Sequence, residues 1–391
     1  MLHDPARHEP LIDTAWDAGR ARAALAAIAA DLAAAFTEDA LWPVHPLDRG
    51  MAAPRYTCLY HGAAGVLWAQ HHLAAEGAIA PVELAPRARA VLAHHRRAPD
   101  AGAPIPSFWV GEVGVLLATW RLDPSAVALS ELRALVDANR DHPANEPFLG
   151  ASGTLLAAVW LAALTEDPAW RSLADAHAEA VRARWQPDPR VGCSLWIQDL
   201  YGEIVDQLGA AHGLAGNVYA LLRVRRDPAV ILLAAEAVHA TALERDGLVN
   251  WPQYALRPRR GRTEVLVQWC HGAPGMITAL SPFLDDDEST RLLLAGGELI
   301  WRAGPLVKGA GLCHGTAGNG FALLELFRRT GDAQWLERAR SFAMHAIAQS
   351  ERMAAAYGQR RYSLYTGDAG LAIYLHACLT GRAGMPLLDV F

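Results

Sequence analysis

The sequence predicts an all-α protein, a seven-fold α/α toroid with an inner and an outer ring of seven helices each. The first observation behind this prediction is an internal repeat, in which a Gly-x-x-Gly turn precedes an apolar run seven times. The seven copies start at Gly62, Gly111, Gly150, Gly213, Gly272, Gly315 and Gly367. Successive copies start 39 to 63 residues apart, which leaves room for two helices and two loops in each repeat.

The second observation is that two kinds of helical segment alternate along the chain. The runs after the glycine turns, such as residues 155–164, are apolar nearly all round, which is typical of buried inner helices. The intervening segments are amphipathic. The clearest, residues 332–350, places Trp335 and Phe342 on one face and offers Asp332 as an N-cap. The alternating Val, Ile and Thr runs that are typical of strands are nearly absent.

Closure into a ring is predicted from the unequal repeat lengths. Insertions before Gly213 and Gly272 fit loops at one mouth of a closed barrel, and a linear solenoid is the alternative. Glycines allow close backbone approach and positive φ where the inner helix starts converge. The positive ends of the helix dipoles would favour anions there, including thiolates. No Pro-rich or Ser/Gly-rich linker divides the chain, so residues 1–391 are predicted to form one domain.

The composition argues against a nucleic-acid-binding protein, a secreted disulfide-rich protein and a membrane-spanning protein. The 391 residues carry a formal net charge of −6, which gives no reason to expect a nucleic-acid partner. Five cysteines without a framework spacing favour a reducing compartment over a secreted disulfide scaffold. The first 22 residues lack the apolar core of a signal peptide. The uncharged stretch 147–165 has too short an apolar part for a membrane span and is interpreted as a buried helix. We therefore expect a cytoplasmic protein without a transmembrane segment.

Two similar tetrapeptides contain the candidate functional residues: Trp-Cys-His-Gly at 269–272 and Leu-Cys-His-Gly at 312–315. They place Cys270 and Cys313, with His271 and His314, at the heads of the fifth and sixth inner helices. Cysteine and histidine are the preferred ligands of zinc. Two cysteines and one histidine form an incomplete tetrahedral shell. The fourth position is left for a substrate, which indicates a catalytic rather than a structural zinc site.

These motifs and the seven glycine turns resemble the lanthionine synthetase C-like family over nearly the whole chain. The resemblance implies a seven-fold α/α toroid with a central zinc ion (Zn2+) held by Cys270, Cys313 and His314. The chain looks more like the eukaryotic-type, glutathione-binding branch than the bacterial peptide cyclases. Those cyclases typically carry tyrosine at the position of His271 and aspartate at the position of Glu146.

Three further positions bear on the choice of branch. Lys308 lies five residues before Cys313, where eukaryotic-type members carry a lysine implicated in glutathione binding; a solvated loop lysine is the alternative. The chain departs from the cyclases at Leu266, where they carry arginine. It also departs from many members in the last repeat, where Thr366 and not an acidic residue precedes the glycine.

The predicted ligands and their polar neighbours suit thiol alkylation. Two thiolate ligands make a soft, weakly acidic zinc centre, which lowers the pKa of a bound thiol and leaves it nucleophilic. The resemblance implies that His212 protonates the enolate that forms when a thiolate adds to a dehydroamino acid. His271 assists that step or orients its neighbours, and Glu146 relays the thiol proton or stabilises a helix start. His61 is expected at the same mouth without an assigned role.

The predicted function is zinc-dependent thioether formation, in which glutathione or a peptide cysteine adds to dehydroalanine or dehydrobutyrine in a peptide or protein. A lanthipeptide cyclase acting intramolecularly is the close alternative. A non-catalytic, zinc-stabilised adaptor that binds peptides or glutathione is a second. A carbohydrate-active toroid is a third, and it would need a carboxylate partner for Glu146, for which Glu112 and Asp368 are only positional candidates.

Two charged clusters are given structural interpretations. The basic residues Arg257, Arg259, Arg260 and Arg262 are interpreted as a solvated loop, with a docking surface for an acidic or phosphorylated peptide as the alternative. The acidic residues 285–288 are expected to open an outer helix.

Overall fold

The computed structural model describes residues 2–48, 55–125, 127–258 and 265–391. Within these ranges the chain is mostly helical, with fourteen α-helices and three two-stranded sheets. The predicted helical class is therefore confirmed. Two 3₁₀ helices, η1 (Pro5–Arg7) and η2 (Pro46–Asp48), both precede the first glycine turn at Gly62. Arg259, Arg260 and Arg262 of the predicted basic loop lie outside the described residues.

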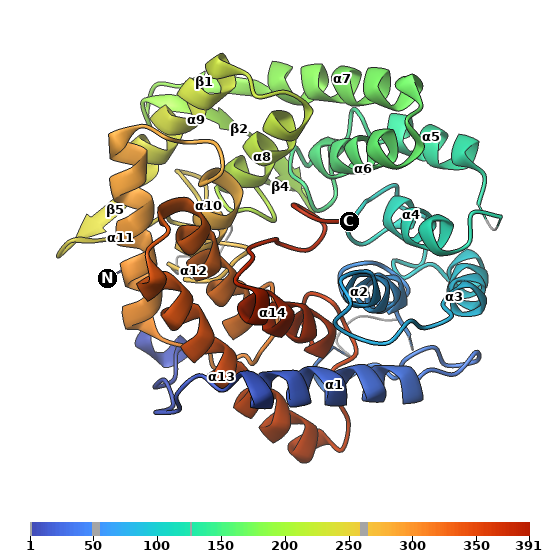
Figure 1. Cartoon of the computed structure of the whole chain (residues 1–391). Helices are drawn as coiled ribbons and strands as arrows, with labels where there is room; N and C mark the ends of the chain where they lie inside the picture. The colour runs from blue at the N-terminus through green and yellow to red at the C-terminus, as the bar shows by residue number, and fades with distance from the viewer. Residues whose placement is uncertain (1, 49–54, 126, 259–264) are drawn as a thin grey trace.

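Seven helices follow the seven glycine turns. They are α2 (Ala63–Ala75), α4 (Glu112–Leu122), α6 (Ala151–Thr165), α8 (Leu214–Val224), α10 (Ala273–Leu280), α12 (Thr316–Thr330) and α14 (Asp368–Thr380). In each helix the first glycine of the motif is the N-cap residue. These helices are buried over most of their surface, as their apolar runs predict. In Figure 1 they surround the middle of the molecule.

The second glycine of each motif is required by a close approach of two backbone segments. A Cβ atom on Gly318 would lie 1.7 Å from the carbonyl oxygen of Leu312, six residues earlier. In the other six repeats the corresponding contact would be 1.9 to 2.1 Å. Positive φ is needed at only one N-cap, Gly272, with φ of 104°. Close approach rather than unusual φ therefore explains most of the repeated glycines.

Seven further helices alternate with these along the chain. They are α1 (Ala18–Ala34), α3 (Ala85–Arg97), α5 (Leu129–Ala138), α7 (Pro168–Ala183), α9 (Pro228–Thr241), α11 (Asp287–Ala303) and α13 (Ala333–Tyr357). Asp332 caps α13 through the backbone N–H of Gln334, as predicted. The helix continues past residue 350 and ends where Gly358 adopts a left-handed conformation. Asp286 caps α11, so the acidic run does open a helix of this series.

The helices that follow the glycine turns contact one another in a cycle. Each of α2, α4, α6, α8, α10, α12 and α14 packs against the next, and α14 packs against α2. The other series lies around them in Figure 1, with α7 against α6 and α13 against α12. The N-terminal helix α1 packs mainly against α14, which brings the two ends of the helical series together.

The two long insertions fold into short antiparallel hairpins, an exception to the predicted all-α class. Before α8, β1 (Trp185–Asp188) pairs with β2 (Cys193–Trp196), and β3 (Gln198–Leu200) pairs with β4 (Glu203–Val205). Before α10, β5 (Leu243–Arg245) pairs with β6 (Leu248–Asn250). The turn between β5 and β6 is Asp246-Gly247, and both residues have positive φ, which two-residue hairpin turns favour.

The helix α6 corresponds to the uncharged stretch at 147–165. Its first eight residues, 151–158, are all buried, as expected of a helix inside the protein. Across the described ranges, no helix is long and apolar enough to cross a membrane.

The C-terminal segment enters the middle of the molecule, as Figure 1 shows. Phe391 packs near Trp68 and Phe108. The Tyr219 hydroxyl donates a hydrogen bond of 2.7 Å to the Asp389 carboxylate. These contacts hold the C-terminal segment against α2 and α8.

Candidate functional site

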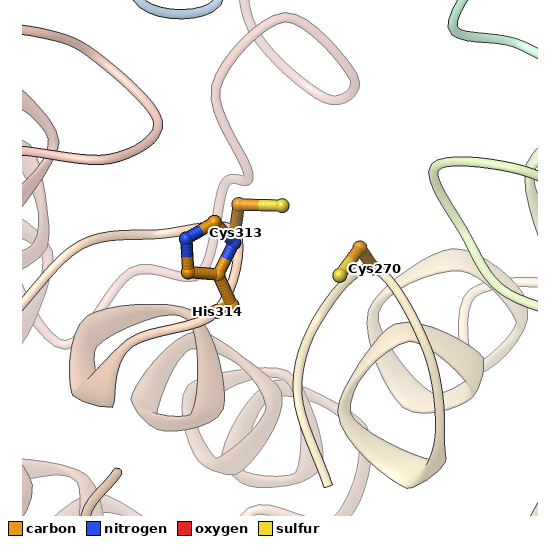
Figure 2. Close-up of side chains that lie close together, drawn as sticks. All are labelled: Cys270, Cys313 and His314. Atoms are coloured by element: carbon orange, nitrogen blue, oxygen red, sulfur yellow. The ribbon is translucent and has the colours of Figure 1, made fainter. Parts of the chain in front are cut away.

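Cys270, Cys313 and His314 form a group of potential metal ligands on two neighbouring turns. Cys270 lies in the turn before α10, and Cys313 and His314 lie in the turn before α12; Figure 2 shows the two sulfur atoms facing each other. One donor atom from each residue lies within 4.8 Å of the others. The backbone N–H of Cys270 donates to the carbonyl oxygen of Cys313 at 3.2 Å, which joins the two turns.

The charge states of the two sulfur atoms are linked. A hydrogen bond from Cys313 lowers the pKa of Cys270, and the neighbouring His271 and His314 act in the same direction. Burial raises the pKa of Cys313, and its contact with Cys270 raises it further. The pKa values of the two thiols are therefore shifted in opposite directions, which makes Cys270 the more acidic of the pair. A bound cation would favour the thiolate form of both.

The donor set fits zinc. Zinc–sulfur bonds of about 2.3 Å and zinc–nitrogen bonds of about 2.0 Å in a tetrahedral shell place ligand atoms about 3.3–3.8 Å apart. Donor atoms already within 4.8 Å of one another need only small side-chain rotations to reach that spacing. Two thiolates and one imidazole also leave the fourth position to a substrate.

Glu146 and His212 form a hydrogen-bonded pair beside this group. Nδ1 of His212 lies 3.2 Å from Oε2 of Glu146. The Glu146 side chain is fully buried while that of His212 keeps 27% exposure, so the imidazole is the member that can meet a substrate. Burial disfavours the imidazolium, but the hydrogen bond and charge of Glu146 outweigh it and raise the pKa of His212. His212 is therefore protonated up to a higher pH than an ordinary histidine.

The backbone fixes the Glu146 carboxylate. It accepts hydrogen bonds from the N–H groups of Phe148 at 2.7 Å and Leu149 at 2.6 Å. The preceding residue, Asn145, has a positive φ of 47°, and its carbonyl accepts a hydrogen bond from Asn217 of α8. Glu146 thus anchors the turn before α6 and contacts His212 at the same time.

His271 lies next to both parts of the site. Its ring stacks on that of His212, with centroids 5.5 Å apart and planes at 24°. Its Nε2 atom lies 3.1 Å from the amide nitrogen of Gln253, which donates to it. With 6% exposure it offers little surface to a substrate, which favours the orienting interpretation over direct assistance.

Two residues that the sequence reasoning missed, Gln268 and Tyr60, interact with the sulfur atoms. The amide nitrogen of Gln268 donates to Sγ of Cys270 at 3.0 Å. Burial raises the pKa of Tyr60, and the charge of the Cys313 sulfur raises it further. A signal for Tyr60 existed, because it stands two residues before a repeat glycine, as both cysteines do. No comparable signal existed for Gln268, whose contact depends on how its turn folds.

Lys308 is exposed on the turn before α12. Burial raises the pKa of the Cys313 thiol, and the charge of Lys308, five residues earlier in the chain, acts in the opposite direction. Lys308 is also the only lysine in the chain, since the other 34 of the 35 Lys and Arg residues are arginine. An exposed ammonium group at this place is available to a carboxylate of a ligand.

Glu112 and Asp368, the positional candidates for a carboxylate pair, make other contacts. Asp368 accepts hydrogen bonds from the Ser350 hydroxyl at 2.5 Å and from the backbone N–H of Arg361 at 3.0 Å. Glu112 lies 3.9 Å from His95. These contacts give no support to the carbohydrate-active alternative.

Arg257 is paired rather than solvated. Its guanidinium group lies 2.8 Å from Asp206 and 2.9 Å from Asp188, and only a quarter of its side chain is exposed. These ion pairs tie the loop to the hairpins of the other insertion. The interpretation as a solvated loop is therefore wrong for this residue, because two buried carboxylates hold it.

A second group of potential metal ligands, Cys58, His61 and Asp100, lies in the first repeat. The Asp100 carboxylate accepts hydrogen bonds of 2.7 to 2.9 Å from the N–H and hydroxyl of Thr57 and from the N–H of Cys58. Nδ1 of His61 lies 3.8 Å from Sγ of Cys58. Hydrogen bonds within the turn thus account for this group without a cation.

Comparison with known families identifies the class to which this fold and site belong. A family model described as "Lanthionine synthetase C-like protein" matches residues 47–383. The chain therefore belongs to the lanthionine synthetase C-like family.

Two curated proteins are similar to parts of the chain. The chain is 33% identical over 209 residues to "Glutathione S-transferase LANCL1" of Danio rerio, which covers 50% of this chain and 47% of that protein. It is 34% identical over 172 residues to "LanC-like protein GCL1" of Arabidopsis thaliana, which covers 41% of this chain and 38% of that protein. The chain thus spans less than half the length of either relative.

Among solved structures, one named "Nisin cyclase" is similar in fold. The TM-score is 0.61, and the match covers 82% of this chain and 88% of that chain at 16% sequence identity. At this identity the likeness shows a common fold and does not by itself assign an activity.

Proposed function

We propose that this protein is a zinc-dependent enzyme that forms thioethers, adding a thiol to dehydroalanine or dehydrobutyrine in a peptide or protein. The observation that carries the proposal is the gathering of Cys270, Cys313 and His314 within 4.8 Å of one another, beside the Glu146–His212 pair. The Cys-Cys-His group is suited to activate a thiol, and the Glu146–His212 pair is suited to deliver a proton. Addition of a thiol to a carbon–carbon double bond needs both an activated thiol and a proton donor.

The proposed architecture is a single seven-fold α/α toroid over residues 1–391, with the metal at one mouth. The cycle of contacts from α2 to α14 supports closure of the ring. Backbone hydrogen bonds run from Cys270 to Cys313, from Cys313 to Tyr365 and from Tyr365 to Tyr60, which supports a common mouth for these turns. A cytoplasmic location stays a prediction, in keeping with five cysteines that form no disulfide.

The potential metal ligands and the other site residues have different proposed roles. Cys270, Cys313 and His314 would hold the zinc ion. When bound, zinc would lower the pKa of a thiol in the fourth position and so make its thiolate available near neutral pH. The substrate sulfur then bonds to the β-carbon, the double bond opens, and negative charge develops on the α-carbon and its carbonyl oxygen.

His212 is proposed to supply the proton that the α-carbon takes up. It is the partly exposed member of its pair, and against the effect of burial the hydrogen bond and charge of Glu146 raise its pKa. After the transfer the neutral imidazole regains a proton from solvent, and the proton lost by the substrate thiol balances the one gained by carbon. Positioned general acids of this kind contribute about 10²- to 10⁴-fold to rate.

Glutathione is the proposed thiol. It carries carboxylates that an ammonium group recognises, and Lys308, the only lysine of the chain, is exposed on the turn that leads to Cys313. The printed name of the Danio rerio relative, a glutathione S-transferase, supports this choice.

Intramolecular addition by a cysteine of the same peptide is the second candidate. The likeness in fold to the protein named nisin cyclase favours it. A non-catalytic adaptor would use the same site without turnover.

Intact mass spectrometry separates these functions. A peptide with one dehydroalanine and one free cysteine is incubated with zinc-loaded protein and glutathione. A glutathione adduct that is absent with Cys313→Ala supports the transferase. An unchanged mass with loss of the free thiol would replace it with the cyclase. A peptide that emerges unaltered, with its thiol free, would contradict both and leave the adaptor.

A further inference from the structure

We infer that Tyr365 is a positioning residue for the two cysteine ligands, and that the C-terminal segment, residues 385–391, holds its side chain from inside the ring of helices. This role rests on the metal site of the proposed function. It concerns how two ligand turns from different repeats keep the spacing that a metal ion requires.

The backbone of Tyr365 is joined to the turn that contains Cys313. Its carbonyl oxygen accepts hydrogen bonds from the N–H groups of Leu312 at 2.8 Å and Cys313 at 2.9 Å. The Cys313 carbonyl oxygen in turn accepts a hydrogen bond of 3.2 Å from the N–H of Cys270. The line of backbone hydrogen bonds that starts at Tyr365 therefore reaches both cysteines.

The ring of Tyr365 packs against the turn of the other cysteine. Its centroid lies 5.1 Å from that of Trp269, the residue before Cys270. Trp109 meets the Tyr365 ring edge-on at 4.9 Å, and the side chain of Tyr365 is fully buried among these neighbours. The backbone of Tyr365 thus holds the Cys313 turn while its ring packs on the Cys270 turn, so that a displacement of Tyr365 would change the spacing of the two ligands.

The hydroxyl of Tyr365 is anchored in the C-terminal segment. It donates a hydrogen bond of 2.5 Å to the carbonyl oxygen of Pro386. The segment is folded into a tight turn around this acceptor. The N–H of Asp389 donates to the Met385 carbonyl at 2.9 Å, and the Asp389 carboxylate accepts a hydrogen bond of 2.7 Å from the Met385 N–H. The fold of the segment therefore fixes the position of the Pro386 carbonyl.

Two inner helices hold this turn in place. The Tyr219 hydroxyl of α8 donates to the Asp389 carboxylate at 2.7 Å, and the indole nitrogen of Trp160 in α6 donates to the Leu387 carbonyl at 3.4 Å. Leu387 is fully buried with a positive φ of 64°, a conformation that a bulky residue keeps only where its surroundings enforce it. The C-terminal segment, in the middle of the molecule in Figure 1, thus links α6 and α8 to the turn before α14.

Metal retention depends on how firmly the protein holds its ligands in the geometry that the ion needs. Loss of the hydrogen bond from Tyr365 to Pro386 would free the Tyr365 side chain, and the Cys313 turn bonded to its backbone would move with it. The two sulfur atoms would then sample spacings that do not suit a tetrahedral ion. The expected consequence is faster release of zinc from a protein that is still folded.

The test measures the rate at which zinc leaves the zinc-loaded protein, followed by the absorbance of a chelator added in excess. Tyr365→Phe removes the hydroxyl and keeps the ring. Tyr374→Phe is the matched control, because the Tyr374 hydroxyl is equally buried and donates to a backbone carbonyl, that of Ala339 in α13, at 2.6 Å. Each variant loses one buried hydrogen bond, so their resistance to urea should fall by similar amounts. Only Tyr365→Phe should release zinc faster, by about fivefold, the effect of one net hydrogen bond.

A further variant tests whether the C-terminal segment acts through Tyr365. Asp389→Ala removes the carboxylate that closes the turn of the segment and anchors it to Tyr219. It should also speed zinc release. The same substitution made in Tyr365→Phe should add less than about twofold, because the connection to the ligand turn is already broken.

Two results would overturn the inference, and both can be read from the tyrosine variants even if Asp389→Ala does not fold. The first is release of zinc from Tyr365→Phe at the wild-type rate. The second is equal acceleration in Tyr365→Phe and Tyr374→Phe, which would indicate general loosening. Independent, multiplying effects of Tyr365→Phe and Asp389→Ala would contradict the part assigned to the C-terminal segment.

The zinc content of the wild type separates this inference from the proposed function. If the wild type holds no zinc, the metal site of the proposed function fails and the role of Tyr365 fails with it. If the wild type holds zinc and Tyr365→Phe releases it no faster, only the role of Tyr365 fails. The measurement needs no substrate, so its outcome does not depend on whether the protein catalyses thioether formation.

Discussion

The partly exposed imidazole of His212 contacts the fully buried carboxylate of Glu146, with Nδ1 3.2 Å from Oε2. This contact connects the turn before α6 to the turn before α8, so it depends on the packing of two repeats. It gives the site a partly exposed imidazole with a buried carboxylate behind it. The arrangement separates the proton donor from the residue that sets its pKa.

Replacing His212 should slow product formation without loss of metal. His212→Gln removes the proposed proton donor, and we expect thioether formation to fall about a hundredfold or more. The rate is followed by mass spectrometry, and zinc is counted on the same sample. His239→Gln, on the outer helix α9, is the control for loss of an imidazole elsewhere. A full rate in His212→Gln would remove this residue from the mechanism.

Replacing Glu146 should change the pH dependence in a defined direction. Glu146 raises the pKa of His212, so the protonated form, and with it the rate, is lost only as pH rises through that raised value. In Glu146→Gln the charge is gone, and the falling limb of the pH–rate profile should move to lower pH. The pH–rate profiles of the two proteins provide the measurement. A limb that stays in place, or moves to higher pH, would show that Glu146 does not set the proton donor.

Lys308 can be tested by chemical labelling because the chain contains no other lysine. An amine acetylating reagent should modify Lys308 and the N-terminus, and glutathione should slow only the reaction at Lys308. Lys308→Met should raise the KM for glutathione about tenfold, as expected for loss of a hydrogen bond to a charged group, with zinc content unchanged. Equal labelling with and without glutathione would argue against this contact.

The glycine turns should tolerate almost no side chain. A methyl group at Gly318 would meet the Leu312 carbonyl at 1.7 Å, so Gly318→Ala should lower the free energy of unfolding by about 2–4 kcal/mol. At Gly384 the nearest atom would be 3.6 Å away, and Gly384→Ala should change stability by less than about 1 kcal/mol. Urea unfolding of both variants gives the comparison. Similar stabilities would mean that the close approach is not a constraint.

Helix placement was predictable because its signals are local. The repeated glycines predict a close backbone contact and the start of a helix. Asp332 caps α13 by accepting a hydrogen bond from the backbone N–H of Gln334, two residues later. The end of α13 was less clear, since the buried face stops near residue 350 while the helix runs on to Tyr357. The hairpins were missed because their strands have only three or four residues, too few for alternation to show.

The site was predictable only where the motif itself contains the residue. Cys270, Cys313 and His314 lie inside the matched tetrapeptides. Tyr60 stands in the first repeat at the position that both cysteines hold in theirs, but its interaction with Cys313 depends on how distant repeats pack together. Gln268 depends on a turn closed by backbone hydrogen bonds, which residue types alone do not encode.

The most direct test of the central claim is a metal titration of activity. Thioether formation is measured for metal-free protein and after addition of one zinc per chain, in the wild type and in Cys270→Ala and Cys313→Ala. The account predicts no turnover without metal, recovery in the wild type at one zinc per chain, and no recovery in either variant. Equal turnover in metal-free protein, or full recovery in either variant, would contradict it.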